Sequence, residues 1–502
     1  MNNKEELLLI QPNTSLTGAF VRMLPLGLLY ASSQIIKKGY SAKLIDLRIN
    51  PSNWMKDLEK AITDKTLIVG ISAMTGIAIS EGIKVSRFIK ERYPDINVVW
   101  GGPHVTFSPE SVFEEKTVDF AIRGYGSVPF MKLYEFLLGK SSEKIEEVMG
   151  LSYRGQSGGI FHNKIDNYFE FVDYDDIPYW LIENFSNYRH VVGNETVFPI
   201  YSVMGCPYKC AFCSSPAQYA TFGKKWVPYE IKKVVSHIKM VKEKYGATYI
   251  YFIDDDSFVD LNHVEEIIDA IKKESLDIKL GFRGARINEI SKMSDNFLQK
   301  LVDAGTNTMH IGVESGSDRL LTLMKKNTTC EQIIEANRKL AKHKQIRVFY
   351  NFIVGFPTET IEETLLTRDI VLKLMEDNPN ACIIPLNKPR PLPNTELYRL
   401  AIKHGYVPPK NLEEWSDYEV ESSYYNPPWL SKEHNDLIRM LFLTMYFIDG
   451  KIHRLAKGNS IKFMVLKILA IIYKPLALYR FRKGYYKFLI EDYIYNFLKK
   501  LI

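Results

Sequence analysis

The feature that most constrains this chain is a group of three closely spaced cysteines. Cys206, Cys210 and Cys213 follow the spacing C-x3-C-x2-C. Three thiolates on one short loop can converge on a single metal site without a ligand from elsewhere in the chain. A four-iron cluster takes four ligands, so three cysteines leave one iron free for an exogenous ligand. The spacing therefore predicts a 4Fe-4S cluster at this loop.

Three other roles for the cysteines are a zinc site, disulfide bonds, and burial in the core without a bound metal. A structural zinc site needs a fourth ligand, usually from a second C-x2-C or an H-x3-H, and the sequence has neither. Five cysteines in 502 residues, three of them adjacent, make no paired disulfide framework. Burial without a ligand is our expectation for Cys330 and Cys382, with a substrate-facing thiol that quenches or relays a radical as their alternative.

The cysteine loop resembles the cluster loop of the radical S-adenosylmethionine (SAM) enzymes, including the aromatic Phe212 just before the last cysteine. The resemblance implies that the amino and carboxylate groups of SAM bind the free iron. It also implies that one electron, from a donor such as flavodoxin or ferredoxin, splits SAM into methionine and a 5′-deoxyadenosyl radical.

Length and composition set the frame for this site. A chain of 502 residues suggests two or three domains, and 46% hydrophobic with 25% charged residues is ordinary globular composition. The polar start, Met1–Leu7, does not look like a signal peptide. Few cysteines and an oxygen-sensitive cluster favour a reducing cytoplasm.

The first 145 residues alternate short apolar runs of strand type with helical patterns such as 26–38 and 79–92. This alternation predicts an α/β domain with a doubly wound, Rossmann-like parallel sheet, which binds ligands at the carboxyl ends of its strands. The predicted strands are Leu7–Ile10, Ala42–Asp46, Leu67–Ile71, Ile96–Trp100 and Val118–Ile122.

Small and polar residues follow these strands. Glycines there let a large flat ligand approach the backbone, although any one of them alone could be only a tight turn. Together the stretches resemble the cobalamin-binding domain that precedes many radical SAM domains, and the resemblance implies that they bind cobalamin. The candidate cofactor-binding residues are Ser72, Thr75, Gly101, Gly102, His104, Gly124 and Gly126.

The resemblance has two departures. Cobalamin-dependent mutases carry D-x-H-x-x-G, whose histidine ligates cobalt, but the comparable turn here reads Asp46-Leu47-Arg48-Ile49-Asn50. Relatives often have an acidic G-E-G-E turn where this chain has Gly124-Tyr125-Gly126-Ser127. We therefore expect cobalamin without a protein imidazole on cobalt. For His104, an axial ligand and a loop histidine hydrogen-bonded to the backbone are the two alternatives.

Residues 146–194 are predicted to connect two domains, with a hairpin over 150–163 and many aromatic residues that favour packing against them. Residues 195–425 then repeat strand and helix six times, which predicts a partial (β/α)6 barrel with its chemistry at the carboxyl ends of the strands. The cysteines follow the first strand. The strands are Phe198–Val203, Tyr249–Ile253, Lys279–Phe282, Met309–Val313, Val348–Val354 and Ala381–Pro385.

The other strand ends also carry polar or glycine-rich motifs, namely Asp254-Asp255-Asp256, Glu314-Ser315, Gly355-Phe356-Pro357 and Pro391–Thr395. A carboxylate and a hydroxyl could hold the SAM ribose by charge-assisted bonds. The family resemblance implies that Glu314 and Ser315 contact SAM and that Gly355 lies near its adenine.

Two arginines, Arg283 and Arg286, close the third strand. Either could face the SAM carboxylate or a substrate anion, or pair with the aspartates. The aspartates themselves could bind a divalent metal, cap the next helix or be solvated.

Residues 426–502 form a basic, apolar tail predicted to be helical. From residue 451 onward there are twelve Lys and Arg against two acids, a net charge of +10, which leaves −4 for the rest of the chain. Lysines inside the apolar run 461–481 and Pro475 argue against a membrane-spanning helix, and nucleic acid is not favoured. The alternatives are a helix pair packed on the barrel and an interfacial helix facing anionic lipid.

These features predict a cobalamin-dependent radical SAM enzyme that methylates an unactivated carbon, with cobalamin facing the substrate across the barrel mouth. The alternative enzyme uses the same radical for oxidative cyclisation or rearrangement, as anaerobic porphyrin-cyclase relatives do. A cluster-bearing scaffold is the alternative outside enzymes, but it would have no need of SAM-binding strand ends. The tail suggests an amphiphilic or lipid-like substrate and peripheral contact with the inner face of the membrane.

Overall fold

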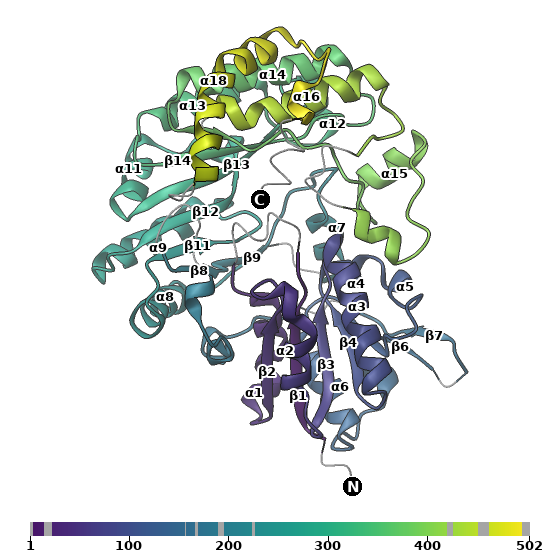
Figure 1. Ribbon diagram of the computed structural model, residues 1–502. Coiled ribbons are helices and arrows are strands. Elements are labelled where there is room, and N and C mark those ends of the chain that lie inside the picture. The colour runs from purple at the N-terminus through teal and green to yellow at the C-terminus, as the bar shows by residue number, and fades with distance from the viewer. Residues whose placement is uncertain are drawn as a thin grey trace. The chain divides into compact units, whose positions relative to one another are not determined.

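The structure is a computed structural model, and it describes residues 4–14, 23–155, 157–165, 169–188, 195–222, 226–418, 425–449 and 461–493. The chain divides into two compact units. The first comprises Met1–His190, Ala217–Lys225 and Pro408–Glu419, and the second comprises Val191–Pro216, Trp226–Val407 and Val420–Ile502. Figure 1 labels the helices and strands of both units.

The first unit is built on a seven-stranded sheet with the order β2-β1-β3-β4-β5-β6-β7. Strands β1 to β5 pair in parallel, and all five coincide with strands predicted from the sequence. The strands are β1 (Glu6–Gln11), β2 (Ser41–Asp46), β3 (Thr66–Ser72), β4 (Asn97–Gly101), β5 (Phe120–Ile122), β6 (Leu151–Arg154) and β7 (Ile160–His162).

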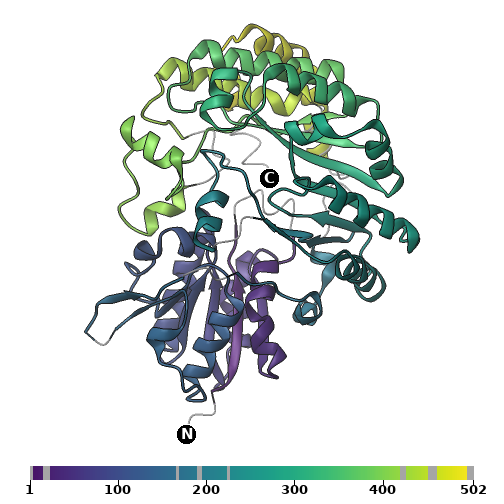
Figure 2. The same ribbon diagram turned by 180° about the vertical axis from the view of Figure 1, so that it is seen from behind.

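Helices follow each parallel strand of this sheet, and α1 packs against α6. The order 2-1-3-4-5 is that of a doubly wound fold: β2 is added on one side of β1, and β3 to β5 are added on the other side. The point where the strand order reverses therefore lies between β1 and β3. The predicted fold class is therefore confirmed for this unit (Figure 2). The helices are α1 (Leu26–Lys37), α2 (Trp54–Ala61), α3 (Ile77–Arg92), α4 (Pro103–Phe107), α5 (Pro109–Val112) and α6 (Ser127–Leu137).

The core of the first unit joins its sheet to α1 and α6. Leu9 and Ile68, on neighbouring strands, are fully buried with Leu133 and Tyr134 of α6. Such a core explains why β1 and β3 read as continuous apolar runs, because a parallel sheet is covered on both faces.

The division into units differs from the boundaries predicted from the sequence. The hairpin predicted over 150–163 is present as β6 and β7, but it continues the first sheet antiparallel to β5 instead of serving as a linker. An unpaired β5 would expose a row of backbone donors and acceptors, and the hairpin satisfies them. Residues 408–419, predicted to belong to the barrel domain, also pack in the first unit.

The second unit contains a six-stranded parallel sheet in sequence order, β15-β14-β13-β12-β11-β8. Each strand coincides with one of the six predicted, so the partial barrel is confirmed, with β8 and β15 at its edges. The strands are β8 (Val197–Ile200), β11 (Tyr249–Phe252), β12 (Lys279–Arg286), β13 (Thr306–Glu314), β14 (Arg347–Phe352) and β15 (Ala381–Ile383), and a separate ribbon pairs β9 (Val203–Gly205) with β10 (Trp226–Pro228).

Sequence signals at the helix ends explain where the barrel helices begin and end. Thr329 and Thr360 each form a capping box at the start of a helix. Gly246 ends α8 in the left-handed conformation at φ +68°. The same helix begins at Ile231, after Pro228, which belongs to β10.

The helices of the second unit are α8 (Ile231–Tyr245), α9 (Leu261–Lys273), α10 (Ile287–Lys292), α11 (Asp295–Asp303), α12 (Asp318–Leu323), α13 (Cys330–Ala341), α14 (Ile361–Asp377), α15 (Glu396–Lys403), α16 (Lys432–Ile448) and α18 (Ile461–Lys483), while α7 (Ser215–Phe222) crosses the boundary between the units in sequence. The tail is helical, as predicted, and α18 packs against α16. No helix of the described residues has an apolar stretch long enough to cross a bilayer.

Candidate functional site

The cysteine loop lies directly after β8 and β9 and is held at its centre by two other segments. The Ala211 N–H donates to the Met324 carbonyl at 3.0 Å, and the Leu397 N–H donates to the Ala211 carbonyl at 2.8 Å. All three cysteines of the loop are free and partly exposed. The end of α12 and the start of α15 therefore fix the backbone between Cys210 and Cys213.

Asp254, at the end of β11, holds the chain just before the cysteines. This carboxylate is fully buried and accepts hydrogen bonds from the Ser202 N–H at 2.7 Å, the Ser202 hydroxyl at 2.6 Å and the Val203 N–H at 3.1 Å. Burial raises the pKa of Asp254 to about 6. The first aspartate of the triplet thus shapes the turn that leads to Cys206.

Arg286, at the end of β12, reaches the cysteine loop. Its guanidinium donates to Cys210 Sγ at 2.8 Å and to the Lys326 carbonyl at 2.6 Å, and it lies over the Tyr208 ring at 3.9 Å. The Tyr208 hydroxyl in turn donates to Glu289 at 2.6 Å. Arg286 therefore places a cation in hydrogen-bond contact with one of the three predicted cluster ligands. The other predicted arginine, Arg283, is exposed.

The cysteines suit an iron–sulfur cluster by their donor chemistry. Burial, with a smaller contribution from Asp256, raises the pKa of Cys206, and burial raises the pKa of Cys213. Iron therefore has to displace thiol protons when it binds. Among the described residues no three metal-binding side chains are already grouped around one point.

Glu314, the predicted SAM ligand at the end of β13, forms a buried ion pair. Its carboxylate lies 3.1 Å from Lys326 Nζ, and the two side chains are 9% and 5% exposed. Glu314 also has φ +73°, a left-handed backbone that is rare outside glycine and is typical of functional sites. Lys326 Nζ lies 6.0 Å from the centre of the Phe212 ring, so this pair reaches the cysteine loop.

Lys326 was missed in the sequence, because a lysine just after a short helix usually lies in solvent. Its burial depends on a pairing with Glu314 across twelve residues of chain. The neighbouring Lys325 is the ordinary case, being half-exposed and paired with Glu396. No local pattern distinguishes the two lysines.

Ser315 and Gly355, also predicted near SAM, have structural partners within the barrel. The Ser315 side chain is fully buried, and its hydroxyl accepts from the Ser317 N–H at 3.1 Å. Gly355, at φ +79°, donates its N–H to Glu359 at 2.7 Å. Burial raises the pKa of Glu359 to about 7. Ser315 and Glu359 thus shape the two turns at the ends of β13 and β14.

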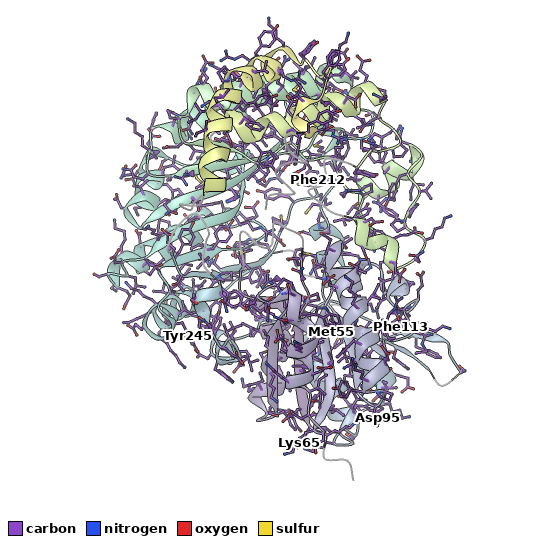
Figure 3. The ribbon with its side chains drawn as sticks, viewed as in Figure 1. Met55, Lys65, Asp95, Phe113, Phe212 and Tyr245 are labelled. Carbon is purple, nitrogen blue, oxygen red and sulfur yellow. The ribbon has the colours of Figure 1, made fainter. Side chains whose placement is uncertain are left out.

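An apolar cluster brings several of the predicted strand-end motifs together. Phe212, labelled in Figure 3, packs against a cluster formed by Leu320, Met324, Phe356 and Leu397. These residues come from the cysteine loop, from α12 after the fourth strand, from the fifth strand end and from α15, whose N-terminus is capped by Thr395. The cysteine loop, the end of the fifth strand and the start of α15 therefore pack together in one apolar cluster.

The candidate cobalamin residues of the first unit also converge at adjacent strand ends. Gly102 has φ +109°, and a Cβ there would lie 2.9 Å from the Ala73 carbonyl. The Ala73 N–H donates to the Gly101 carbonyl at 2.7 Å, and the Gly124 N–H donates to the Thr106 hydroxyl at 3.0 Å. The ends of β3, β4 and β5 thus lie side by side and present mainly backbone atoms, and we call this the strand-end surface. Ser72 and Gly126 are close to it in sequence. A surface with few side chains suits a flat macrocycle.

His104 is buried beneath this surface, and both of its ring nitrogens have partners. Nδ1 lies 3.0 Å from the Thr75 hydroxyl and Nε2 lies 3.1 Å from the Ser111 hydroxyl. Burial lowers the pKa of His104 to about 4, so the ring is neutral near pH 7. Trp415 packs edge-on against it, with ring centres 5.4 Å apart. The partners of the ring are side-chain hydroxyls and not the backbone groups that a loop histidine was expected to bind.

In the turn after β2, where mutases carry their cobalt-ligating histidine, the side chains of this protein bond to one another. Arg48 donates to Asp46 through its backbone N–H at 3.0 Å and its Nε at 2.8 Å, and the Tyr188 hydroxyl adds a bond of 3.0 Å to the same carboxylate. This turn carries no histidine, and both ring nitrogens of His104 already contact hydroxyls. Cobalamin without a protein nitrogen on cobalt stays a prediction.

The two remaining cysteines lie apart from the cysteine loop. Cys382 is buried in β15, as expected. Cys330 begins α13, where its N–H donates to Asp318 at 2.8 Å, and it is only partly buried. Burial raises the pKa of the Cys330 thiol to about 12.

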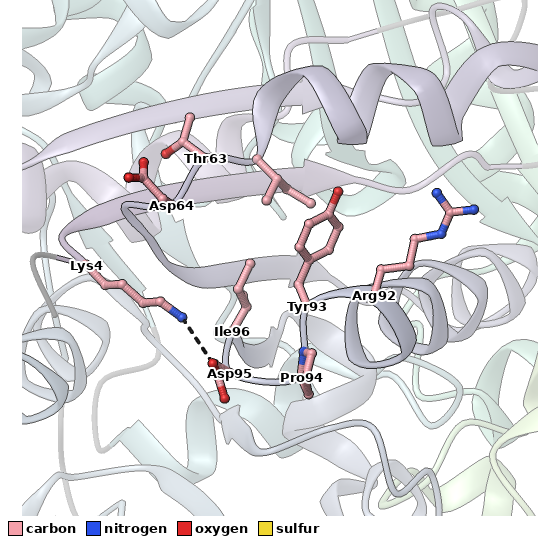
Figure 4. A pocket seen from close by; sticks show the side chains of 9 residues that line it. Lys4, Thr63, Asp64, Arg92, Tyr93, Pro94, Asp95 and Ile96 are labelled. Carbon is pink, nitrogen blue, oxygen red and sulfur yellow. Dashed lines mark ion pairs between the residues drawn. The ribbon is translucent and has the colours of Figure 1, made fainter.

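Two further cavities of the first unit are distinct from the strand-end surface. One of about 360 Å³ is lined by residues such as Lys4, Asp64 and Tyr93, and lies at the amino ends of the strands (Figure 4). The other, of about 700 Å³, follows the edge strand β2 and the segment 180–188. Doubly wound sheets bind ligands at the carboxyl ends of their strands, so neither cavity is in the expected place.

The fold and these sites define a class of protein: an α/β binding unit combined with a partial barrel that carries a three-cysteine loop. Family models agree. Residues 19–134 match the B12 binding domain, and residues 200–370 match the radical SAM superfamily.

The chain is similar to several known proteins. It is 28% identical to an uncharacterised methyltransferase of Pyrococcus horikoshii, over 84% of this chain and 87% of that protein. It is also 28% identical to the anaerobic magnesium-protoporphyrin IX monomethyl ester cyclase of Rubrivivax gelatinosus, over 71% and 63%. The solved structure of the cobalamin-dependent SAM radical enzyme OxsB with aqua-cobalamin and SAM matches at TM-score 0.69 and 17% identity, over 94% and 71%.

The chain therefore belongs to the radical SAM enzymes that carry a B12-binding domain. These two domains imply a 4Fe-4S cluster, SAM and cobalamin as its cofactors, a reductant as its partner and a small molecule as its substrate. The family resemblance inferred from the cysteine loop and the strand ends is confirmed.

Proposed function

We propose that this enzyme transfers a methyl group to an unactivated carbon of an amphiphilic small molecule. When bound, the cluster and SAM supply a hydrogen-abstracting radical, and cobalamin supplies the methyl group. The observation that carries the proposal is the single site made by the anchored cysteine loop, Phe212, Lys326 and Glu314. The similarity to the Pyrococcus methyltransferase over most of both chains supports methylation as the outcome.

The residues of the barrel have separate tasks in this proposal. Cys206, Cys210 and Cys213 would hold the cluster, with Arg286 donating a hydrogen bond to Cys210 Sγ. Glu314 would accept hydrogen bonds from the SAM ribose, and Lys326 balances its charge in the buried site. Phe212 and Phe356 would exclude water from the bound SAM, because a radical site needs a dry surrounding.

The residues of the first unit would hold cobalamin mainly through backbone. Gly101, Gly102, Gly124 and Gly126 leave room for the macrocycle, while Ser72 and Thr75 stand beside them at the end of β3. In this proposal His104 supports the surface through its bonds to Thr75 and Ser111 and does not bind cobalt.

Product stoichiometry tests methylation directly. Anaerobically reconstituted enzyme, a reductant such as reduced flavodoxin or ferredoxin, SAM and cobalamin are incubated with metabolites extracted from a deletion strain. Methylation uses one SAM for the radical and one for the methyl group, so 5′-deoxyadenosine and S-adenosylhomocysteine should form in equal amounts. The matched control is the Cys206→Ala, Cys210→Ala, Cys213→Ala variant, which should form neither product.

Cyclisation is the second candidate function, favoured by the similarity to the anaerobic protoporphyrin cyclase. It would give 5′-deoxyadenosine with no S-adenosylhomocysteine. Mass spectrometry of the new product separates the two outcomes, since methylation adds one CH₂ and oxidative cyclisation removes hydrogen.

A further inference from the structure

The helix α18 is apolar on two opposite sides. On one side Ala470, Ala477 and Phe481 are buried, and the helix packs against α16. On the opposite side large apolar residues face solvent, with Ile471 60% and Ile472 70% exposed. A surface helix of a globular protein is normally polar on its outer face, so the outer face of α18 needs an explanation.

The exposed residues form a continuous line along the helix, which we call the apolar stripe. Ile468, Ile472, Leu476 and Tyr479 recur every three or four positions, which places them on one face, and Ile471 lies next to Ile472 at the border of that face. The stripe comprises Ile468, Ile471, Ile472, Leu476 and Tyr479. Directly after the helix, Phe488 and Tyr493 are each 81% exposed. Of the face predicted from the sequence around Val465, Leu466, Leu469 and Ile472, only Ile472 has a described side chain.

Cations border the stripe. Lys474, Arg482, Lys483 and Lys487 are exposed, and none of the four forms an ion pair with another described residue. The two acids of this segment are not available to balance them. Glu491 is buried against Arg480 at 2.7 Å, and Asp492 pairs with Arg439 at 2.7 Å. Within 468–493, the exposed charged side chains that have no ion-pair partner among the described residues are therefore all cations, and they border the apolar stripe.

We propose that this surface binds the headgroup region of an anionic lipid bilayer. The cations match anionic headgroups, and the stripe would lie among the upper acyl chains, as in other interfacial helices. Charge complementarity selects this occupant, since an apolar stripe without cations would fit any hydrophobic partner. The packed inner face and the lipid-facing outer face use opposite sides of one helix, so the two alternatives left open by the sequence hold together.

The proposal is independent of the proposed methyl transfer, because binding can be measured without turnover. Full-length protein is floated with vesicles of equal parts phosphatidylglycerol and phosphatidylcholine, and with vesicles of phosphatidylcholine alone. We expect flotation only with the anionic vesicles. It should decrease in about 1 M salt, where the screening length is about 3 Å. Failure to float with anionic vesicles at low salt would overturn the proposal.

Two sets of variants assign the binding to this surface. Replacing Lys474, Arg482, Lys483 and Lys487 by Gln should lower partitioning at least about a hundredfold at low salt. The matched control replaces four exposed lysines of other helices, Lys232, Lys273, Lys292 and Lys403, by Gln and should change partitioning little. Equal loss in both variants would mean general attraction of a basic protein and would contradict a specific surface.

A second variant and its control measure how much the apolar stripe contributes to membrane binding. Ile471→Ser with Ile472→Ser should reduce partitioning about tenfold or more even at high salt, whereas Val407→Ser, at another exposed apolar position, should not. Light scattering of the free protein completes the test. A dimer that the double variant separates would show that the stripe binds a second copy of the chain, and the lipid proposal would then be wrong.

Discussion

The two candidate sites use opposite means to hold their residues. In the barrel, charged side chains from distant strands do the positioning: Asp254 fixes the turn before the cysteines, Arg286 contacts Cys210, and Lys326 pairs with Glu314. In the first unit, glycines and backbone bonds form the surface, and the polar side chain beneath it, His104, is neutral. A charged ligand set suits a cluster and a zwitterionic cofactor, whereas a backbone surface suits a large neutral ring.

The largest expected effect concerns the cluster itself. Cys206→Ala, Cys210→Ala and Cys213→Ala should each abolish it, because a four-iron cluster needs three protein thiolates to leave only one iron open. Iron and sulfide analysis after anaerobic reconstitution measures this, with about four of each per chain expected in the wild type. Cys330→Ala and Cys382→Ala are the controls and should keep the cluster. Loss of iron in either control would contradict the ligand assignment.

The second effect concerns the buried charge pair of the barrel, Glu314 with Lys326. Lys326→Met should lower the free energy of unfolding by about 3–5 kcal/mol, because it leaves Glu314 buried without a partner. Lys325→Met, at the half-exposed neighbour, should change it by less than about 1 kcal/mol. Urea denaturation provides the comparison.

A double variant sharpens the same test. Glu314→Gln with Lys326→Met removes both charges and should recover part of the lost stability while still weakening SAM binding. Equilibrium dialysis with SAM shows whether Glu314 is a ligand. Unchanged SAM affinity in the double variant would limit this pair to a structural role.

Sequence patterns were sufficient for every parallel strand of the seven-stranded and six-stranded sheets and for the position of the cysteine loop, because apolar runs and ligand spacing are local signals. They failed where a partner comes from far along the chain. Lys326 looks like any surface lysine, and nothing near Trp415 indicates that it packs on His104, more than three hundred residues earlier. The hairpin at 151–162 was predicted as a hairpin, but its pairing with β5 depends on an edge that local sequence does not reveal.

The third effect is a pH dependence specific to the first unit. His104 has a folded pKa of about 4, below the 6.5 of an exposed histidine. As pH falls below 6.5, His104 binds a proton in the unfolded chain but stays neutral in the folded protein. The free energy of unfolding therefore decreases as the pH falls from 6.5 toward 4. The loss should be about 2–3 kcal/mol between pH 7 and pH 4.5, measured as wild type minus His104→Gln in urea.

One control variant and one spectroscopic measurement test the role assigned to His104. His162→Gln, at a less buried histidine of the same unit whose pKa is lowered mainly by burial, should remove a smaller part of the pH dependence. Electron paramagnetic resonance of the cobalt(II) form should show no nitrogen splitting in wild type. A splitting that disappears in His104→Gln would make His104 the axial ligand and would overturn its structural role.

The smallest effect distinguishes a glycine that the cobalamin surface needs from one that it does not. Gly102→Ala should destabilise the protein by about 1–3 kcal/mol, since the residue has φ +109° and its Cβ would lie 2.9 Å from the Ala73 carbonyl. Gly27, inside α1, has no atom within 4 Å of an added Cβ, so Gly27→Ala should stabilise by about 0.5–1 kcal/mol. If the strand-end surface holds cobalamin, Gly102→Ala should also weaken cobalamin binding in a spectrophotometric titration, whereas Gly27→Ala should leave it unchanged. Equal cobalamin affinity in both variants would show that the tight approach at Gly102 serves only the turn between β4 and α4.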